Sequence, residues 1–61
     1  MTFKIQYFRD GKMIGETPWD KPLPQTRKVA ADGLNRHNAE YAAILDMDDD
    51  AKLVATVSRH A

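Results

Sequence analysis

Apolar and polar side chains alternate along residues 2–9. This period of two, carried by aromatic and β-branched residues, is typical of a half-buried strand. The apolar positions on one side of the strand are Phe3, Ile5 and Tyr7. The dipeptide Asp10-Gly11 follows and favours a type I′ turn, because both central positions of that turn need positive φ. We therefore predict a hairpin whose second strand covers residues 12–17 and ends at Pro18, which has no N–H for the ladder.

A plain two-residue turn at Asp10-Gly11 also fixes the pairing of this hairpin. The pairs expected from that turn are Phe8 with Met13, Tyr7 with Ile14, and Ile5 with Glu16. A connector with three prolines follows over residues 17–24. We expect its Trp19 to cover the end of the core rather than to bind a ligand.

The period changes to 3.6 over residues 22–38, which predicts an amphipathic helix. The apolar stripe of this helix consists of Val29, Ala30, Gly33, Leu34 and His37. Pro24 fits the first turn, where a missing N–H costs nothing, and Asn38 suits the left-handed conformation that ends a helix. Gly33 inside a helix costs about 1 kcal/mol relative to alanine, so we expect it to let a bulky side chain of the sheet approach closely.

Residues 39–47 and 52–59 return to a strand-like composition and predict a second hairpin around an acidic turn. No glycine fixes that turn, so two registers stay open. A two-residue turn at Asp49-Asp50 pairs Glu40 with Arg59, Ala42 with Val57, and Ile44 with Ala55. A three-residue turn instead pairs Tyr41 with Val57, Leu45 with Leu53, and Asp46 with Lys52. In either register both faces of the hairpin carry apolar side chains, and a single helix covers only one of them.

These elements predict one α+β domain over residues 1–61, in ββαββ order, with a four-stranded, mainly antiparallel sheet and one helix packed on one face. A fully antiparallel sheet has the strand order 2-1-3-4 or 1-2-4-3, and the pattern does not choose between them. The side chains predicted to form the core are Phe3, Ile5, Tyr7, Ile14, Val29, Ala30, Leu34 and Ile44.

A chain of 61 residues gains only modest stability from its own core, because a domain of that size buries about 60% of the surface that its unfolded chain exposes. The chain has no cysteine, which removes disulfides and thiolate zinc sites as supports. Association with another chain is the support that remains for so small a scaffold.

Nine basic and nine acidic residues cancel, which disfavours a dedicated nucleic-acid binder, since such proteins usually carry a basic excess. No apolar run approaches the ~20 residues of a membrane span, and the N-terminus lacks the basic and apolar regions of a secretory signal. We therefore expect a cytoplasmic protein without membrane contact.

Candidate catalytic and metal-binding residues are few. Residues 46–50 have the D-x-D-x-D opening of a calcium loop, but Ala51 and Val57 stand where that loop needs a glycine and a bidentate glutamate. The single serine, Ser58, lies on a predicted strand with no base beside it, and we expect His37 to pack against the core or cap the helix. We therefore expect no metal, no cofactor and no enzymatic activity.

The motifs Phe3-x-Ile5-x-Tyr7-x-Arg9-Asp10-Gly11, Thr17-Pro18-Trp19 and Ala39-x-Tyr41-Ala42-x-Ile44-x-Asp46 resemble those of a group of short uncharacterised bacterial proteins of about this length. The resemblance covers nearly the whole chain and implies the hairpin–helix–hairpin plan. It implies no activity and assigns no catalytic or binding residue.

The function expected from this plan is that of a small non-enzymatic interaction module, which forms a homodimer or binds a protein partner through the sheet face left open by the helix. The candidate interaction face consists of Phe8, Met13, Tyr41, Leu45 and Met47. The alternative is a nucleic-acid-binding module that uses a basic helix face. The residues of that face are Arg27, Lys28 and Arg36, joined by Arg59 and His60 if the C-terminal end lies beside the helix.

Overall fold

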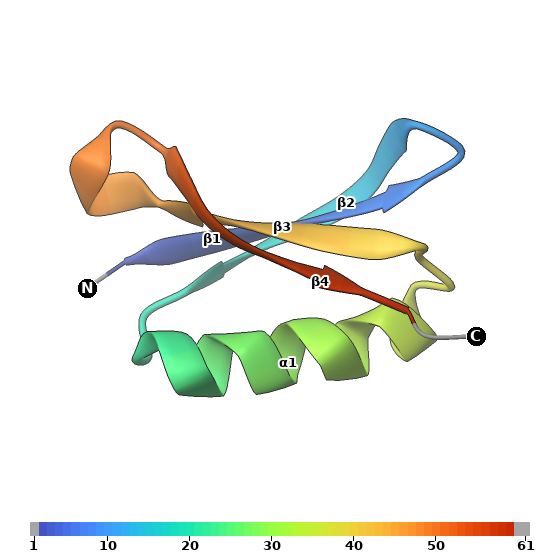
Figure 1. Cartoon of the computed structure of the whole chain (residues 1–61), viewed down its shortest axis with the longest axis horizontal. Helices are drawn as coiled ribbons and strands as arrows, with labels where there is room; N and C mark the ends of the chain where they lie inside the picture. Colours follow the sequence, from blue (N-terminus) through green and yellow to red (C-terminus); the bar gives the residue numbers. More distant parts are fainter. Residues whose placement is uncertain (1, 60–61) are drawn as a thin grey trace.

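The computed structural model describes residues 2–59 and shows a four-stranded antiparallel sheet with a helix across one face (Figure 1). The elements are β1 (Phe3–Arg9), β2 (Lys12–Trp19), α1 (Leu23–Arg36), β3 (Tyr41–Asp46), the 3₁₀ turn η1 (Met47–Asp49) and β4 (Lys52–Ser58). The strand order is β2-β1-β3-β4. The predicted α+β fold in ββαββ order is confirmed, and of the two strand orders left open the first is the one observed.

The first hairpin turns as predicted but pairs differently. Asp10 and Gly11 have φ values of 54° and 76°, which is the positive pair that a type I′ turn needs. Beyond the first pairs the register shifts by one residue, at a β-bulge that leaves Ile14 without an opposite residue. The pairs are Phe8 with Met13, Tyr7 with Gly15, Gln6 with Glu16, and Ile5 with Thr17. The predicted pairs Tyr7–Ile14 and Ile5–Glu16 are therefore wrong.

Strand β2 also runs two residues further than predicted, through Pro18 to Trp19. Proline is tolerated there because β2 is an edge strand, where a missing N–H need not break a ladder.

Helix α1 begins without a side-chain N-cap and ends in a complete Schellman motif. At its start, the buried Thr26 donates its hydroxyl hydrogen to the Lys21 and Pro22 carbonyls, both at 3.0 Å. At its end, Asn38 has φ 52° as predicted, and the Ala39 N–H donates to the Leu34 carbonyl at 2.9 Å. Within residues 2–59 no helix is long and apolar enough to cross a membrane.

The second hairpin contains both registers that the sequence left open. Ala42 pairs with Val57 and Ile44 with Ala55, as a two-residue turn predicts. Nearer the turn, Leu45 pairs with Leu53 and Asp46 with Lys52, as a three-residue turn predicts. The change occurs between Ile44 and Leu45, at a bulge whose extra residue is Val54. Each edge strand therefore carries one β-bulge.

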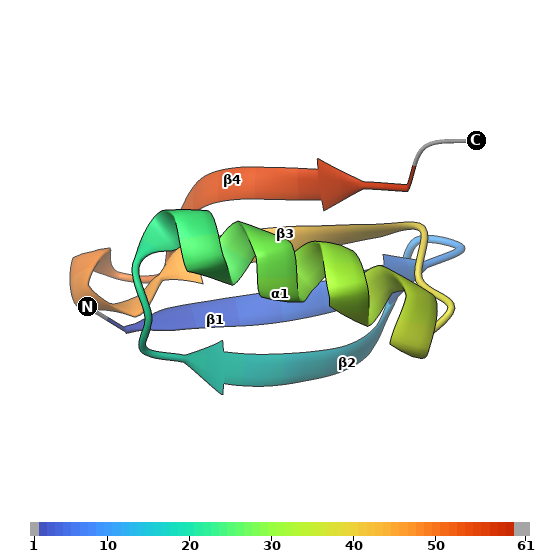
Figure 2. The ribbon, with the colours of Figure 1, turned by 90° about the horizontal axis from the view of Figure 1, so that it is seen from below.

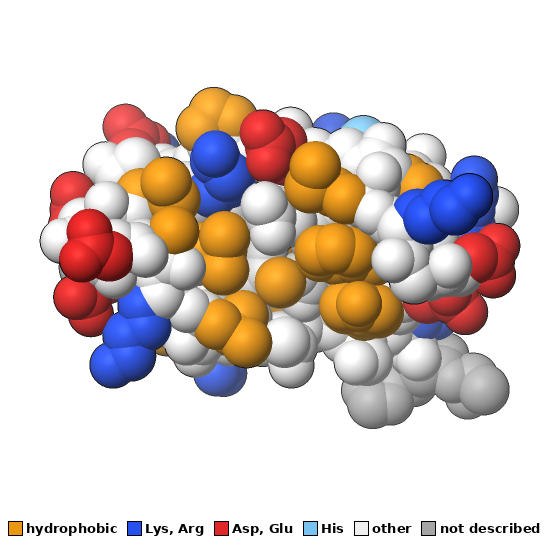
Figure 3. Space-filling view, turned by 90° about the horizontal axis from the view of Figure 1, so that it is seen from above, with side chains coloured by type: hydrophobic (Ala, Val, Ile, Leu, Met, Phe, Trp, Pro, Cys, Tyr) orange, Lys and Arg blue, Asp and Glu red, His pale blue; other side chains and the backbone are white. Residues whose placement is uncertain are grey.

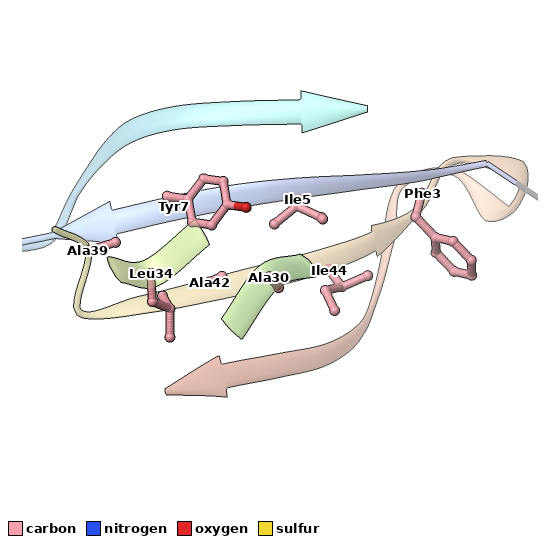
Figure 4. Close-up of a cluster of buried hydrophobic side chains, with 8 residues drawn as sticks. All are labelled: Phe3, Ile5, Tyr7, Ala30, Leu34, Ala39, Ala42 and Ile44. Carbon is pink, nitrogen blue, oxygen red and sulfur yellow. The ribbon is translucent and has the colours of Figure 1, made fainter. Parts of the chain in front are cut away.

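The core lies between α1 and the facing side of the sheet (Figure 4). Six of the eight predicted core residues are buried, and the other two, Ile14 and Val29, are half-buried against the cluster. Ala39 and Ala42 are also fully buried, although neither was predicted to be. Trp19 packs against the cluster as expected.

Gly33 has the role expected of it. A Cβ atom at this position would overlap the ring and hydroxyl of Tyr7, so the glycine lets the ring lie directly under the helix.

Candidate functional site

The side of the sheet that faces away from α1, called here the open face, carries three rows of side chains that run across the strands. The first row is Met13, Phe8, Tyr41 and Ser58; the second is Glu16, Gln6, Ala43 and Thr56; the third is Pro18, Lys4, Leu45 and Leu53. The first and third rows are mostly apolar, and the second is mostly polar. The open face therefore has an apolar row toward each end.

The apolar side chains of the open face reach solvent (Figure 3). Met13 is 51% exposed, Leu53 55% and Tyr41 37%. The Phe8 and Tyr41 rings stack nearly parallel, with centroids 4.9 Å apart and an interplanar angle of 11°. The stacking fixes two rings side by side, which gives this end of the open face a rigid apolar surface.

A small charged network joins the second and third rows of the open face. Lys4 and Glu16 form an ion pair across β1 and β2, with Nζ 3.8 Å from Oε1. Gln6 donates from Nε2 to Oε2 of Glu16 at 3.4 Å. Both charged side chains are partly exposed, so the pair adds little to stability. It does place both signs of charge on the open face, Glu16 in the second row and Lys4 in the third.

Four of the five residues of the predicted interaction face, namely Phe8, Met13, Tyr41 and Leu45, lie on the open face. Met47 does not extend β3 as predicted: it lies in η1, because the Asp46 side chain accepts a hydrogen bond from the Asp48 N–H at 3.0 Å and starts a turn there. Leu53 was missed, although its pairing with Leu45 in one predicted register was the signal that places it on this face.

The acidic turn has a structural role. Besides the Asp46 cap, the Asp48 Oδ2 atom accepts a hydrogen bond from the Thr2 N–H at 2.9 Å, and the Met47 N–H donates to the Thr2 carbonyl. These bonds attach the start of the chain to the turn. Among residues 2–59 no three His, Cys, Asp or Glu side chains are grouped so as to hold a metal ion.

The residues of the nucleic-acid alternative do not gather in one patch. Arg27 and Arg36 are nine positions apart, which at ~100° per residue puts them on opposite flanks of α1. Arg36 also lies 3.7 Å from the carboxylate of Asp32. Lys28 is exposed on the helix between these flanks.

Arg59, proposed to join that patch, lies at the end of α1 instead. Its guanidinium donates to the Asn35 Oδ1 atom at 3.1 Å and to the Leu34 carbonyl at 3.4 Å, so it satisfies the helix C-terminus. His60 falls outside the described residues.

A second surface feature lies on the other side of the sheet, where α1 packs on β1, β3 and β4 and leaves β2 beyond its edge (Figure 2). A groove of about 220 Å³ runs between helix and strand. From the sheet it is lined by Tyr7, Thr17 and Trp19. From α1 it is lined by Val29, Asp32, Gly33, Arg36 and His37. Nothing in the hydrophobic pattern of the sequence indicates this groove.

The polar groups of this groove have distinct surroundings. The His37 ring lies over Tyr7, with centroids 4.5 Å apart, and approaches the backbone of Gly15. Burial raises the pKa of Tyr7 above its ordinary value; nearby Arg36 lowers it in part and nearby Asp32 raises it further. The Trp19 Nε1–H is buried and donates to no described residue.

No protein-family model matches this chain, and no curated protein or solved structure matches it either. The resemblance to the bacterial group therefore stays an expectation.

Proposed function

We propose that this protein is a small non-enzymatic interaction module that associates with a second copy of itself through the open face. The observation that carries the proposal is the position of the exposed apolar side chains. Met13, Tyr41 and Leu53 all lie on the face that α1 leaves uncovered. Burying such side chains is the main source of association free energy between proteins.

The edges of the sheet support a contact through the face rather than through a strand. An unprotected edge strand offers a row of free backbone groups to another chain, and a bulge disrupts that row. Both edge strands, β2 and β4, contain a bulge, and β2 contains Pro18 as well. Strand-to-strand pairing of two copies is therefore disfavoured at both edges.

The dimensions of the open face suit a weak dimer. The whole Cα trace extends 30 Å in the direction of the strands and 15 Å across them (Figure 2), and these values set an upper limit on the area of the face. Two such faces in contact bury roughly 900 Å² before the side-chain rim is added, just below the ~1,200 Å² of the smallest standard interfaces. We therefore expect a dissociation constant on the order of 10 µM to 1 mM.

Charge is compatible with a twofold contact. Each copy carries Lys4 and Glu16 next to each other on the open face, so a twofold axis in the interface can bring the ammonium of one copy to the carboxylate of the other. Like charges then do not face each other, and the apolar rows are free to pack.

The test is sedimentation velocity of the full chain at concentrations from 10 µM to 1 mM. We expect the weight-average mass to rise from 6.9 kDa toward twice that value. The double variant Met13→Lys with Leu53→Lys should stay monomeric, because it places like charges on the buried rows. The matched control adds the same two charges on the exposed side of α1, by Gln25→Lys with Ala31→Lys, and should associate like the parent.

A mass of one chain throughout that concentration range would overturn self-association. Equal loss of association in both double variants would show that the added charge acts from anywhere on the surface and would overturn the assignment to the open face.

A further inference from the structure

We propose that the groove between α1 and β2 binds a free apolar α-amino acid. The site lies on the opposite side of the sheet from the open face, so it does not depend on self-association. The groove combines apolar walls with a pair of opposite charges at its rim.

The walls suit an apolar side chain of moderate size. Trp19 and Val29 line the groove from the strand and the helix, and the buried Tyr7 ring forms its floor. Gly33 contributes no side chain, so the Tyr7 hydroxyl lies directly against the backbone of α1 at this position. A volume of about 220 Å³ lies below the ~300–1,000 Å³ of most small-molecule sites, so it suits a ligand smaller than a nucleotide.

The rim carries both signs of charge side by side. Asp32 and Arg36 are one helical turn apart and both line the groove. Their nearest atoms, Oδ2 and Nη2, are 3.7 Å apart, which is beyond hydrogen-bonding distance, so each keeps its hydrogen-bonding capacity. Their side chains are 75% and 78% exposed, so both charges stand at the solvent edge of the groove rather than inside it.

A zwitterion satisfies this rim better than a single charge does. A simple carboxylate that binds Arg36 must lie beside the Asp32 carboxylate, and a simple ammonium that binds Asp32 must lie beside a guanidinium. An α-amino acid presents its carboxylate to Arg36 and its ammonium to Asp32, and its side chain can enter between Trp19 and Val29. Tyr7 and Thr17 also line the groove, and neither hydroxyl makes a hydrogen bond to another described residue.

The test is an NMR titration of the ¹⁵N-labelled full chain with L-phenylalanine. The chain has one tryptophan, so its single indole N–H signal reports on the groove directly. We expect saturable shifts of this signal with a dissociation constant on the order of 1 mM, as befits a ligand of about a dozen heavy atoms. N-acetyl-L-phenylalanine, which lacks the ammonium, and L-phenylalaninamide, which lacks the carboxylate, should each bind about 2- to 5-fold more weakly.

Two variants test which charged group of the ligand each side chain binds. In Asp32→Asn, L-phenylalanine should bind no better than its N-acetyl derivative; in Arg36→Gln, it should bind no better than its amide. Asp49→Asn and Lys28→Gln make the same charge changes away from the groove and should leave all affinities unchanged.

Absence of saturable shifts up to 20 mM L-phenylalanine would overturn the site. Equal affinity for the amino acid and both derivatives in the parent chain would overturn the zwitterion and leave only a nonspecific apolar contact.

Discussion

Replacing Gly33 by alanine should destabilise this protein, although alanine is the better helix former. In an exposed helix position the exchange stabilises by about 1 kcal/mol. Here the new methyl group would occupy the place of the Tyr7 ring and hydroxyl, and that ring is held by the buried face of β1. Overpacking of this kind typically costs 1–3 kcal/mol, and the overlap with a fixed ring puts Gly33→Ala at the upper end. We expect a net loss of about 2 kcal/mol.

That loss is a large part of the total. A chain of this length has a free energy of unfolding of roughly 3–9 kcal/mol. The assay is urea denaturation followed by far-UV circular dichroism. The free energies of unfolding of parent and variant are compared with one shared m-value, the slope of the free energy against urea concentration.

A second substitution isolates the cause. Tyr7→Leu removes the hydroxyl and the outer ring atoms that the methyl group would meet. In the Tyr7→Leu background, Gly33→Ala should therefore stabilise by up to about 1 kcal/mol, as helix propensity alone predicts. The control is Ala31→Gly at an exposed position of α1, which should cost about 1 kcal/mol in both backgrounds. If Gly33→Ala stabilises the parent chain, or costs the same in both backgrounds, the contact with Tyr7 is not what requires the glycine.

Three further predictions follow from the core, the second turn and the buried phenol. Leu34→Ala should cost about 2–5 kcal/mol because Leu34 is only 3% exposed; a loss below 1 kcal/mol in urea denaturation would contradict its place in the core. Ala51→Gly should leave stability unchanged or raise it by up to about 1 kcal/mol, since Ala51 has φ 58° and glycine adopts that conformation freely; a lower melting temperature would refute this. Because the pKa of Tyr7 is raised on folding, the unfolded chain loses its proton first, so stability should fall as pH rises above about 10. Tyr7→Phe should reduce that fall, and an unchanged pH dependence would assign it to other groups.

Local signals account for the parts of the fold that could be predicted from the sequence. The alternation in β1, the Asp10-Gly11 turn and the left-handed Asn38 each depend on a few neighbouring residues. Gly33 was informative for the same reason: a glycine in a helix costs about 1 kcal/mol relative to alanine, so its presence indicates that another group occupies the space of a side chain.

The end of β3 was less predictable because competing local bonds decide it. Strand composition continues through Met47, yet the Asp46 carboxylate caps a 3₁₀ turn instead. The left-handed Asp50 and Ala51 then close the connection without a glycine. Neither the Asp46 cap nor the left-handed residues can be recognised from the hydrophobic periodicity of the sequence.

The groove between α1 and β2 could not be predicted at all. It exists because the helix packs over β1, β3 and β4 and leaves one edge strand uncovered. That offset is a tertiary feature, set by how Tyr7 fits under Gly33 and how Arg59 holds the other side of the helix. The charges of Asp32 and Arg36 were visible as a helical pair, but nothing in the sequence placed them beside Trp19.

The bulges of the two edge strands decide which surfaces this fold presents. Without the bulge at Ile14, the register that starts at Phe8 and Met13 would continue and place Glu16 opposite Ile5, a carboxylate against a fully buried side chain. The free-energy cost of placing Glu16 there was the one sign in the sequence that the register without a bulge is unfavourable. The bulge turns Glu16 to the open face and brings Trp19 to the side of the helix. In β4 the equivalent bulge pairs Leu53 with Leu45, where an unbroken ladder would set it against Asp46 under the helix. One extra residue in each edge strand thus supplies both the exposed leucine of the proposed dimer contact and the aromatic wall of the proposed amino-acid site.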